Sequence, residues 1–284
     1  MAQTTNNHTL TDGPIKMPDV TKSPQADPER AVDTTWVARH KDMAMEWKRA
    51  IARWVANHYI RYGDVVQVGS GTQMTTFIEG IQDRQSDKKE RLDLLVLTSN
   101  LEVAPTGRQP GKYPMRIILT GGEVLESLYC LAGEYAARAV STELFFPRVV
   151  VLGAAGIKFT DQRPLSYHFP DEVSTQVAYA TRPTEHRIIM CDHTKFGFHD
   201  GLKADLTLRD LLAGAEKCTV VTSMPDNDQV AVDRLKGEED ALRKSLNALP
   251  KNEFAGKDFV LEFVSRDGTR AGGLSLKEER ARAQ

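Results

Sequence analysis

One stretch decides the expected fold, Val65-Val66-Gln67-Val68-Gly69-Ser70-Gly71-Thr72-Gln73-Met74-Thr75-Thr76, in which an apolar run meets a glycine turn and then a helix-like segment. Gly69 and Gly71 permit turn dihedrals that other residues avoid, and they let the backbone approach a ligand closely. The following helix offers unpaired N–H groups and the positive end of its dipole. The stretch therefore predicts a buried strand, a tight turn and a helix start that can bind phosphate.

The glycine turn matches neither of the two common phosphate-binding motifs. A Walker loop continues with Gly-Lys-Ser/Thr, and the dinucleotide fingerprint needs a third glycine and a later acidic partner. A strand-to-helix turn that binds no ligand therefore stays open as an alternative.

The composition predicts one core of α/β size in a cytoplasmic protein. The 284 residues are 40% hydrophobic with a net charge of −2, so the chain has no basic excess for general nucleic-acid binding. The longest apolar run, Val149 to Ile157, is too short to span a membrane, and Met1 to Leu10 has no apolar targeting core. Cys130, Cys191 and Cys218 lie in apolar surroundings and predict reduced thiols.

The chain divides into three parts. Residues 1–33 contain four prolines among polar residues and predict a disordered arm, because they bury too little apolar surface to offset the entropy of ordering. Residues 34–224 predict the α/β domain, which begins with a covering helix within Trp36–Ile60. Residues 225–284 predict a C-terminal appendage of helix, strand and charged tail that packs on the core or mediates assembly.

Short apolar runs alternate with helical segments along the domain. After Val65–Val68, the expected strands are Leu92–Thr98, Arg116–Thr120, Val149–Leu152, Arg187–Cys191, Cys218–Thr222 and, in the appendage, Phe259–Val264. The expected helices are Thr72–Ile81, Glu123–Leu144, Val173–Thr181, Leu206–Ala215 and Asp228–Leu249. Apolar strands separated by helices predict a mainly parallel, Rossmann-like sheet with helices on both faces. Ligands bind such sheets at the carboxyl ends of the strands.

The covering helix carries an apolar stripe. Its residues Trp47, Ile51, Trp54, Val55 and Tyr59 share one face at helical spacing. The stripe predicts packing against the sheet, and stacking on nucleobases is the alternative.

Polar and glycine-containing loops follow successive strands in a specific order. They are Gly71-Thr72, Thr98-Ser99-Asn100, Gly121-Gly122, Leu131-Ala132-Gly133, Gly153-Ala154-Ala155-Gly156 and Asp192-His193-Thr194-Lys195-Phe196-Gly197. This series, over residues 46 to 224, resembles the C-terminal effector-sensing domain of DeoR-family sugar-metabolism repressors, relatives of ribose-5-phosphate isomerase and the CoA transferases. The resemblance implies a pocket for a phosphorylated sugar or a related small metabolite, without a cofactor.

The resemblance also implies roles for individual residues. The phosphate would be held by Gly69, Ser70, Gly71, Thr72 and Thr75, and sugar hydroxyls by Ser99 and Asn100. The same rim would carry Gly121, Gly122 and Asp192, together with the positive charge of Lys195. Sensor domains of this kind often self-associate, so we expect a homo-oligomer or a protein partner.

Departures from the family pattern favour binding over catalysis. Gly69 stands where the sensors show Asp, and Ala155 stands where they show the Asp of Gly-Ala-Asp-Gly. The Asp-Gly-Ala-Asp and Lys-Gly-Gly motifs that move protons in the isomerases are missing. No helix-turn-helix pattern precedes the covering helix, which predicts a stand-alone sensor module with no DNA-binding head and no catalytic residue.

Two other functions stay open. An enzyme of the same superfamily would use Glu123, Glu172 or Asp192 in an unfamiliar arrangement. A structural subunit would have a degenerate pocket filled by side chains, with contacts through the C-terminal appendage.

Two further groups of residues match no standard site motif. His193, His199 and Asp200 lie close in sequence, but their spacing matches no standard metal-ligand motif. Ser70 lacks the Gly-X-Ser-X-Gly elbow of a nucleophilic serine.

Deletion of residues 1–33 should leave the melting temperature and the response to ligands nearly unchanged, because this segment has no apolar periodicity. Deletion through Trp54 should be severely destabilising, because it removes most of the apolar stripe. Thermal melts of the two truncated proteins check this pair of expectations, and a large loss from the shorter deletion would contradict the assignment of an arm.

Overall fold

The computed structural model describes residues 44–142, 145–250 and 254–282, which belong to one compact unit. The expected arm, residues 1–33, lies outside the described residues, as does the part of the expected first helix before residue 44. Within the described residues, no helix is long and apolar enough to cross a membrane.

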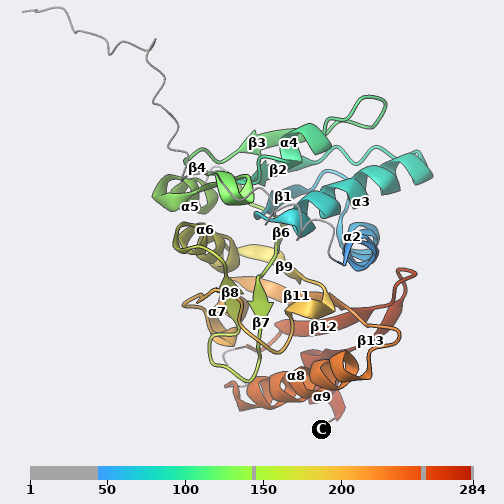
Figure 1. Ribbon diagram of the computed structural model, residues 1–284, viewed down its shortest axis with the longest axis vertical. Coiled ribbons are helices and arrows are strands. Elements are labelled where there is room, and N and C mark those ends of the chain that lie inside the picture. The colour runs from blue at the N-terminus through green and yellow to red at the C-terminus, as the bar shows by residue number, and fades with distance from the viewer. Residues whose placement is uncertain (1–43, 143–144, 251–253, 283–284) are drawn as a thin grey trace, which may run out of the picture. The chain divides into compact units, whose positions relative to one another are not determined.

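One large sheet organises the unit (Figure 1). Its strands in chain order are β1 (Val65–Val68), β2 (Leu95–Thr98), β3 (Arg116–Leu119), β6 (Val149–Leu152), β9 (Thr184–Met190), β11 (Ala215–Ser223), β12 (Asp258–Val264) and β13 (Arg270–Ser275). Their spatial order is β13-β12-β11-β9-β6-β1-β2-β3, and all neighbours pair in parallel except β12 with β13. The seven parallel strands have the order of a doubly wound sheet, so the predicted mainly parallel Rossmann-like fold is confirmed.

Helices and two small sheets complete the unit. The helices are α2 (Met45–Tyr59), α3 (Thr72–Lys88), α4 (Val103–Thr106), α5 (Gly133–Ser141), α6 (Pro170–Thr181), α7 (Leu208–Ala213), α8 (Gln229–Ala248) and α9 (Leu276–Arg282), with 3-10 turns η2 (Glu126–Leu128) and η3 (His193–Lys195). One small sheet pairs β4 (Glu123–Leu125) with β5 (Cys130–Ala132), and the other contains β7 (Gly156–Ile157), β8 (Leu165–Tyr167) and β10 (Leu202–Lys203).

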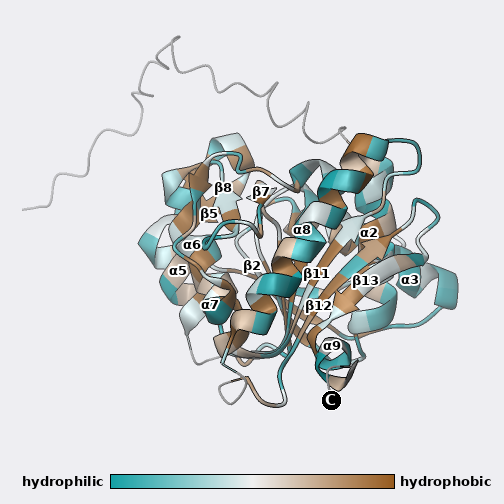
Figure 2. Ribbon diagram, turned by 90° about the horizontal axis from the view of Figure 1, so that it is seen from below, coloured by the Kyte–Doolittle hydropathy of each residue, from teal (hydrophilic) through white to brown (hydrophobic). Residues whose placement is uncertain are grey.

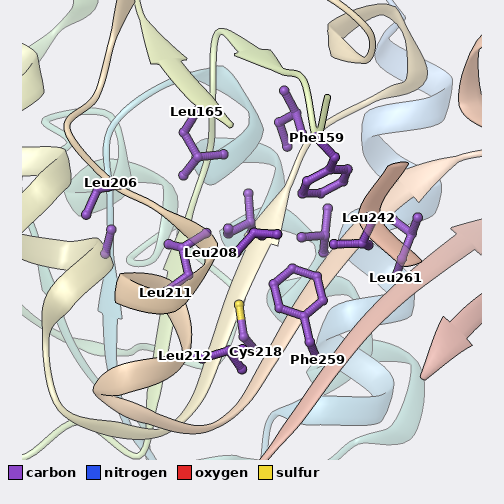
Figure 3. Packing of buried hydrophobic residues seen from close by; sticks show 14 of the residues in the cluster. Phe159, Leu165, Leu206, Leu208, Leu211, Leu212, Cys218, Leu242, Phe259 and Leu261 are labelled. Carbon is purple, nitrogen blue, oxygen red and sulfur yellow. The ribbon is translucent and has the colours of Figure 1, made fainter. Parts of the chain in front are cut away.

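The large sheet is apolar on both faces. Along β6, Val149 and Val151 belong to one buried cluster and Val150 and Leu152 to the other, because successive side chains of a strand point to opposite faces. Helices α2, α3 and α4 contribute to the first cluster, and α5 to α9 contribute to the second. Figure 3 shows part of the second cluster, where side chains of α7 and α8 surround Phe259 of β12. In Figure 2, α8 carries hydrophilic and hydrophobic residues, as expected for a helix with one buried face.

The chain reverses its winding at β1. The helices after β1 and β2 cover one face of the sheet, whereas the helices after β3, β6, β9 and β11 cover the other. The connections therefore diverge between β1 and β6, which are neighbours in the sheet. This divergence leaves a crevice at the carboxyl ends of the two strands, where doubly wound sheets bind their ligands.

The predicted helix Glu123–Leu144 is wrong in its first half. The segment forms β4, η2 and β5 before α5 begins at Gly133. Backbone hydrogen bonds from Leu101 to Tyr129 (2.9 Å) and from Leu131 to Ser99 (2.7 Å) bind it to the loop after β2. These long-range bonds outweigh a helical propensity that is worth only tenths of a kcal/mol per residue.

The segment after residue 224 continues the large sheet. The predicted helix and strand are present as α8 and β12, whereas β13 is an additional strand that the sequence did not predict. A Cβ at Gly273 would lie 2.1 Å from the carbonyl oxygen of Leu261, so only glycine permits this close pairing.

Four residues of the predicted stripe on α2 pack against the sheet, whereas Trp47 contacts the ring of His193 in η3. Ile51 and Val55 are fully buried, and two aromatic residues also bind the carboxylate of Glu262 on β12. Trp54 Nε1 donates to Glu262 Oε2 at 2.9 Å, and Tyr59 Oη donates to the same oxygen at 2.5 Å. One buried carboxylate thus fixes the carboxyl-terminal half of α2.

Replacement Glu262→Leu should lower the free energy of unfolding by about 1–3 kcal/mol, because it leaves two part-buried donors without an acceptor. Tyr62→Phe is the matched control. Tyr62 is 68% exposed, and its hydroxyl donates a hydrogen bond to Asp93 at the surface. Urea unfolding of both variants measures the difference. Equal, small effects would show that the Glu262 contacts do not hold α2.

Candidate functional site

A cavity lies at the carboxyl ends of the central strands. Its wall includes residues 70–73 after β1, residues 153–155 after β6, residues 190–192 at the end of β9, and Thr194 and Lys195 of η3. About 100 Å³ is open to the centres of water molecules. One water needs about 10–15 Å³ by this measure, so the cavity has room for a small metabolite.

Other elements close the cavity. They contribute Lys48 of α2, Glu102 after β2, Leu128 of η2, residues 167–168 at the end of β8, and Glu172 of α6. The sequence pattern did not predict Lys48, Glu102, Tyr167 or His168 in this site, because none of them lies within the loop motifs that follow the expected strands. Only the folded sheet brings these segments together.

The turn after β1 has the geometry of an anion site. Gly71 has a φ of 101°, which favours glycine, and α3 begins at Thr72. Met74 N donates to Gly71 O at 3.0 Å, but no hydrogen bond within the described residues uses the amides of residues 70–73. These amides belong to the cavity wall, and they stand at the positive end of a 17-residue helix.

Thr75 and Asn100 support this turn from behind. Asn100 Nδ2 donates to Gly71 O at 3.1 Å and to Thr75 Oγ1 at 3.3 Å. Thr75 Oγ1 in turn donates to Glu102 Oε2 at 3.0 Å. The lining of the cavity includes neither Thr75 nor Asn100, so they orient Gly71 and Glu102. Ser99 is also outside the lining, and its amide donates to the Tyr179 hydroxyl at 2.9 Å.

Three predicted glycines lie outside the cavity wall. A Cβ at Gly69 would be 3.0 Å from Gln176 Oε1, and one at Gly122 would be 2.7 Å from Ala132 O. Gly122, which also has a φ of 116°, therefore needs glycine, whereas a side chain at Gly69 would require only that Gln176 shift, and the expected unusual dihedral is absent there. Gly121 is exposed in the turn before β4, at a φ of 73°.

Asp192 and Lys195 line the cavity together. Asp192 Oδ1 accepts hydrogen bonds from Thr194 N (3.0 Å) and from the Thr194 hydroxyl. The Asp192 side chain thereby caps η3. This cap positions Lys195 in the wall. Among the described residues, no ion pair engages the Lys195 ammonium group, which leaves its charge available to an anionic ligand.

Glu172 is a buried acid in the same wall. Glu172 is only 7% exposed, and Ser70 Oγ donates a hydrogen bond to Glu172 Oε1 at 3.1 Å. Gln176 Nε2 donates to Ser70 Oγ at 2.5 Å and to Glu172 Oε1 at 3.3 Å. Burial raises the pKa of Glu172 above its usual value, although the hydrogen bonds from Ser70 and Gln176 partly oppose this shift.

Tyr167 and Cys191 give the wall two further buried groups. Within the described residues, the Tyr167 hydroxyl and Glu172 Oε2 have no hydrogen-bond partner. Burial raises the pKa of the Cys191 thiol well above its usual value, and the adjacent Asp192 charge acts in the same direction. The thiol is therefore uncharged at neutral pH.

The histidines of this region have partners other than a metal. His193 Nδ1 lies 2.8 Å from Ser223 Oγ, and His199 Nε2 lies 3.4 Å from Asp161 Oδ2. In the part of the chain that the structure describes, no three His, Cys, Asp or Glu side chains are grouped to hold a metal ion. Asp200 Oδ2 lies 3.8 Å from His168 Nδ1.

The fold and the site define a class of protein, a doubly wound α/β domain with a polar cavity at its switch point. The family model of the DeoR C terminal sensor domain matches residues 43–212, which is more than half of the 284 residues. The chain belongs to this family of sensor domains. A comparison with curated proteins found no match.

Solved structures give distant likenesses. Ribose 5-phosphate isomerase from Plasmodium falciparum is 13% identical with a TM-score of 0.36, and the match covers 55% of this chain and 54% of the isomerase. eIF2B delta from Chaetomium thermophilum is 17% identical with a TM-score of 0.37, over 64% and 59% of the two chains. A monomeric glucosamine-6-phosphate deaminase is 10% identical with a TM-score of 0.33, over 78% and 93%. The chain thus matches about half the length of the isomerase.

Glu172→Gln should stabilise the ligand-free protein increasingly as pH rises. Below the pKa of Glu172 in the unfolded chain, the carboxyl is neutral in both states, so its stabilising contribution is fully present. As pH rises from there through the raised pKa of the folded protein, unfolding releases a proton and that contribution is lost at about 1.4 kcal/mol per unit of pKa difference. Glutamine does not ionise and avoids the loss.

Thermal melts of wild type and variant from about pH 4 to about pH 8 measure this difference. Asp171→Asn, at an exposed carboxylate in the same helical turn, is the control and should show no comparable growth with pH. A constant difference for Glu172→Gln would show that burial does not shift the acid.

Proposed function

We propose that the cavity binds a phosphorylated sugar or a related phosphorylated metabolite as the effector of a sensor domain. The observation that carries this proposal is the turn at residues 70–73, whose amides have no partner within the described residues and belong to the cavity wall. Such amides at a helix start form a ready anion site.

Two lysines support an anionic ligand. Lys195 of η3 and Lys48 of α2 reach the cavity from segments that are far apart in the sequence. Lys48 is only 5% exposed, and a charged hydrogen bond in such a shielded place contributes more than one on the surface.

Polar groups beside the turn suit the hydroxylated part of a sugar. Glu102 and Asp192 lie in the wall and offer carboxylate oxygens as acceptors. Ser99 and Asn100, which the resemblance assigned to sugar hydroxyls, lie behind the wall and stay candidates only for indirect support. The space within the cavity speaks against a degenerate site filled by side chains.

One observation favours a second function, an isomerase- or transferase-like enzyme. Glu172 is a cavity carboxyl whose pKa burial raises, which is the property of many general acids and bases. Asp192 also lies in the wall, whereas Glu123 is exposed on β4 and lines no part of the cavity. Sensing remains the first proposal because it follows from the family.

A panel of sugar phosphates, but not the matching free sugars, should raise the melting temperature. Ligand at a hundred times its dissociation constant adds about 2.7 kcal/mol to the free energy of unfolding. Lys195→Met should weaken binding by about 1.5–3 kcal/mol, the range for a hydrogen bond to a charged group. Isothermal titration calorimetry measures both affinities.

Lys244→Met serves as the control, because Lys244 is an exposed residue of α8 outside the cavity wall. Equal stabilisation by sugars with and without phosphate would contradict the anion turn. An NMR assay for aldose–ketose exchange tests the second function, and turnover that Glu172→Gln abolishes would establish the enzyme.

A further inference from the structure

The acid in the cavity wall is bonded directly to the turn that the proposed function assigns to phosphate. Ser70 belongs to that turn, and its hydroxyl bonds Glu172 Oε1 at 3.1 Å. An anion on the amides of residues 70–73 therefore lies against the residue whose hydroxyl holds the carboxyl group. Like charges this close repel strongly where water is excluded, so an ionised Glu172 opposes the anion.

The hydrogen bonds of Glu172 divide its two oxygens. Oε1 accepts from Ser70 and Gln176, whereas Oε2 has no partner within the described residues. A proton on the carboxyl group removes the negative charge that opposes the anion. Oε2 itself has almost no accessible surface, so the proton acts through the charge and not through a bond to the ligand.

We propose that Glu172 is a specificity-determining residue of the cavity, which admits the anion together with one proton carried on the Glu172 carboxyl group. The inference rests on the proposed function, because it places the anion at residues 70–73. The proton comes from solvent, and no other bond forms or breaks. Burial, which raises the pKa of Glu172, favours the protonated form that this uptake requires.

Other titratable groups share the cavity wall with Glu172 or lie behind it. They are Lys48, Glu102, His168, Cys191, Asp192 and Lys195 in the cavity wall, with Tyr167 in the same wall and Cys130 behind it. Burial raises the pKa of Cys130 to about 12, and Cys191 and Tyr167 are also shifted upward, so these three take up no proton on binding below pH 9. His168 is the remaining group whose side-chain type changes charge near neutral pH.

Sulfate is the probe, because it keeps two negative charges throughout the useful pH range whereas a phosphate ester titrates. Calorimetry between about pH 5 and about pH 9, in buffers with different ionisation enthalpies, gives the affinity and the protons taken up. Above the pKa of Glu172, the wild-type affinity should fall by up to about tenfold per pH unit, with uptake approaching one proton. Glu172→Gln should bind with no such slope and no uptake, and His168→Asn should keep the slope.

Three results overturn the inference. They are the same slope in wild type and Glu172→Gln, loss of the slope in His168→Asn, and no sulfate binding even at about pH 5, where the proton is readily supplied. Sugar phosphates that bind without any of these linked effects would leave the proposed function in place and remove only the role of Glu172. If neither sulfate nor any sugar phosphate binds, both proposals fail.

Discussion

A strand with parallel neighbours on both sides must be covered on both faces, and this constraint at β1 shapes the rest of the unit. Its backbone groups bond β2 on one side and β6 on the other, and the sheet is apolar above and below. One chain covers both faces only by reversing the direction of its connections. The reversal opens the crevice in which the cavity lies, so the site is a consequence of burying the strand.

The cavity combines charges of both signs, and their placement depends on distant contacts. Lys48 reaches the wall from α2, whose other end is fixed through Trp54 and Tyr59 to Glu262. Lys195 reaches it from a 3-10 turn that Asp192 caps. The position of α2 and the cap of η3 therefore determine the positive electrostatic field at the glycine turn. The buried Glu172 adds an opposing charge that depends on pH.

The fold was largely predictable because its signals are local and repeated. Apolar strands such as Val149–Leu152, separated by helices, indicate a parallel sheet without knowledge of any contact. The glycine turn, Asp192 and Lys195 were likewise visible, because loops that follow parallel strands share one edge. The error at Glu123–Leu144 and the unpredicted β13 arise where long-range pairing overrides propensity. Glu102 was missed because it lies two residues beyond the Thr98-Ser99-Asn100 motif, and His168 because no sequence pattern links its segment to the strand ends.

The Cys191 thiol makes transient opening of the cavity wall measurable. Its thiol lies in the wall, and burial keeps it protonated, whereas alkylating reagents attack the thiolate. Cys130 and Cys218 are also buried, but neither lines the cavity. The labelling rate at position 191 therefore reports how often the wall opens to solvent. The labelling rate of this native thiol therefore measures the motions that admit a ligand, and no engineered cysteine is needed.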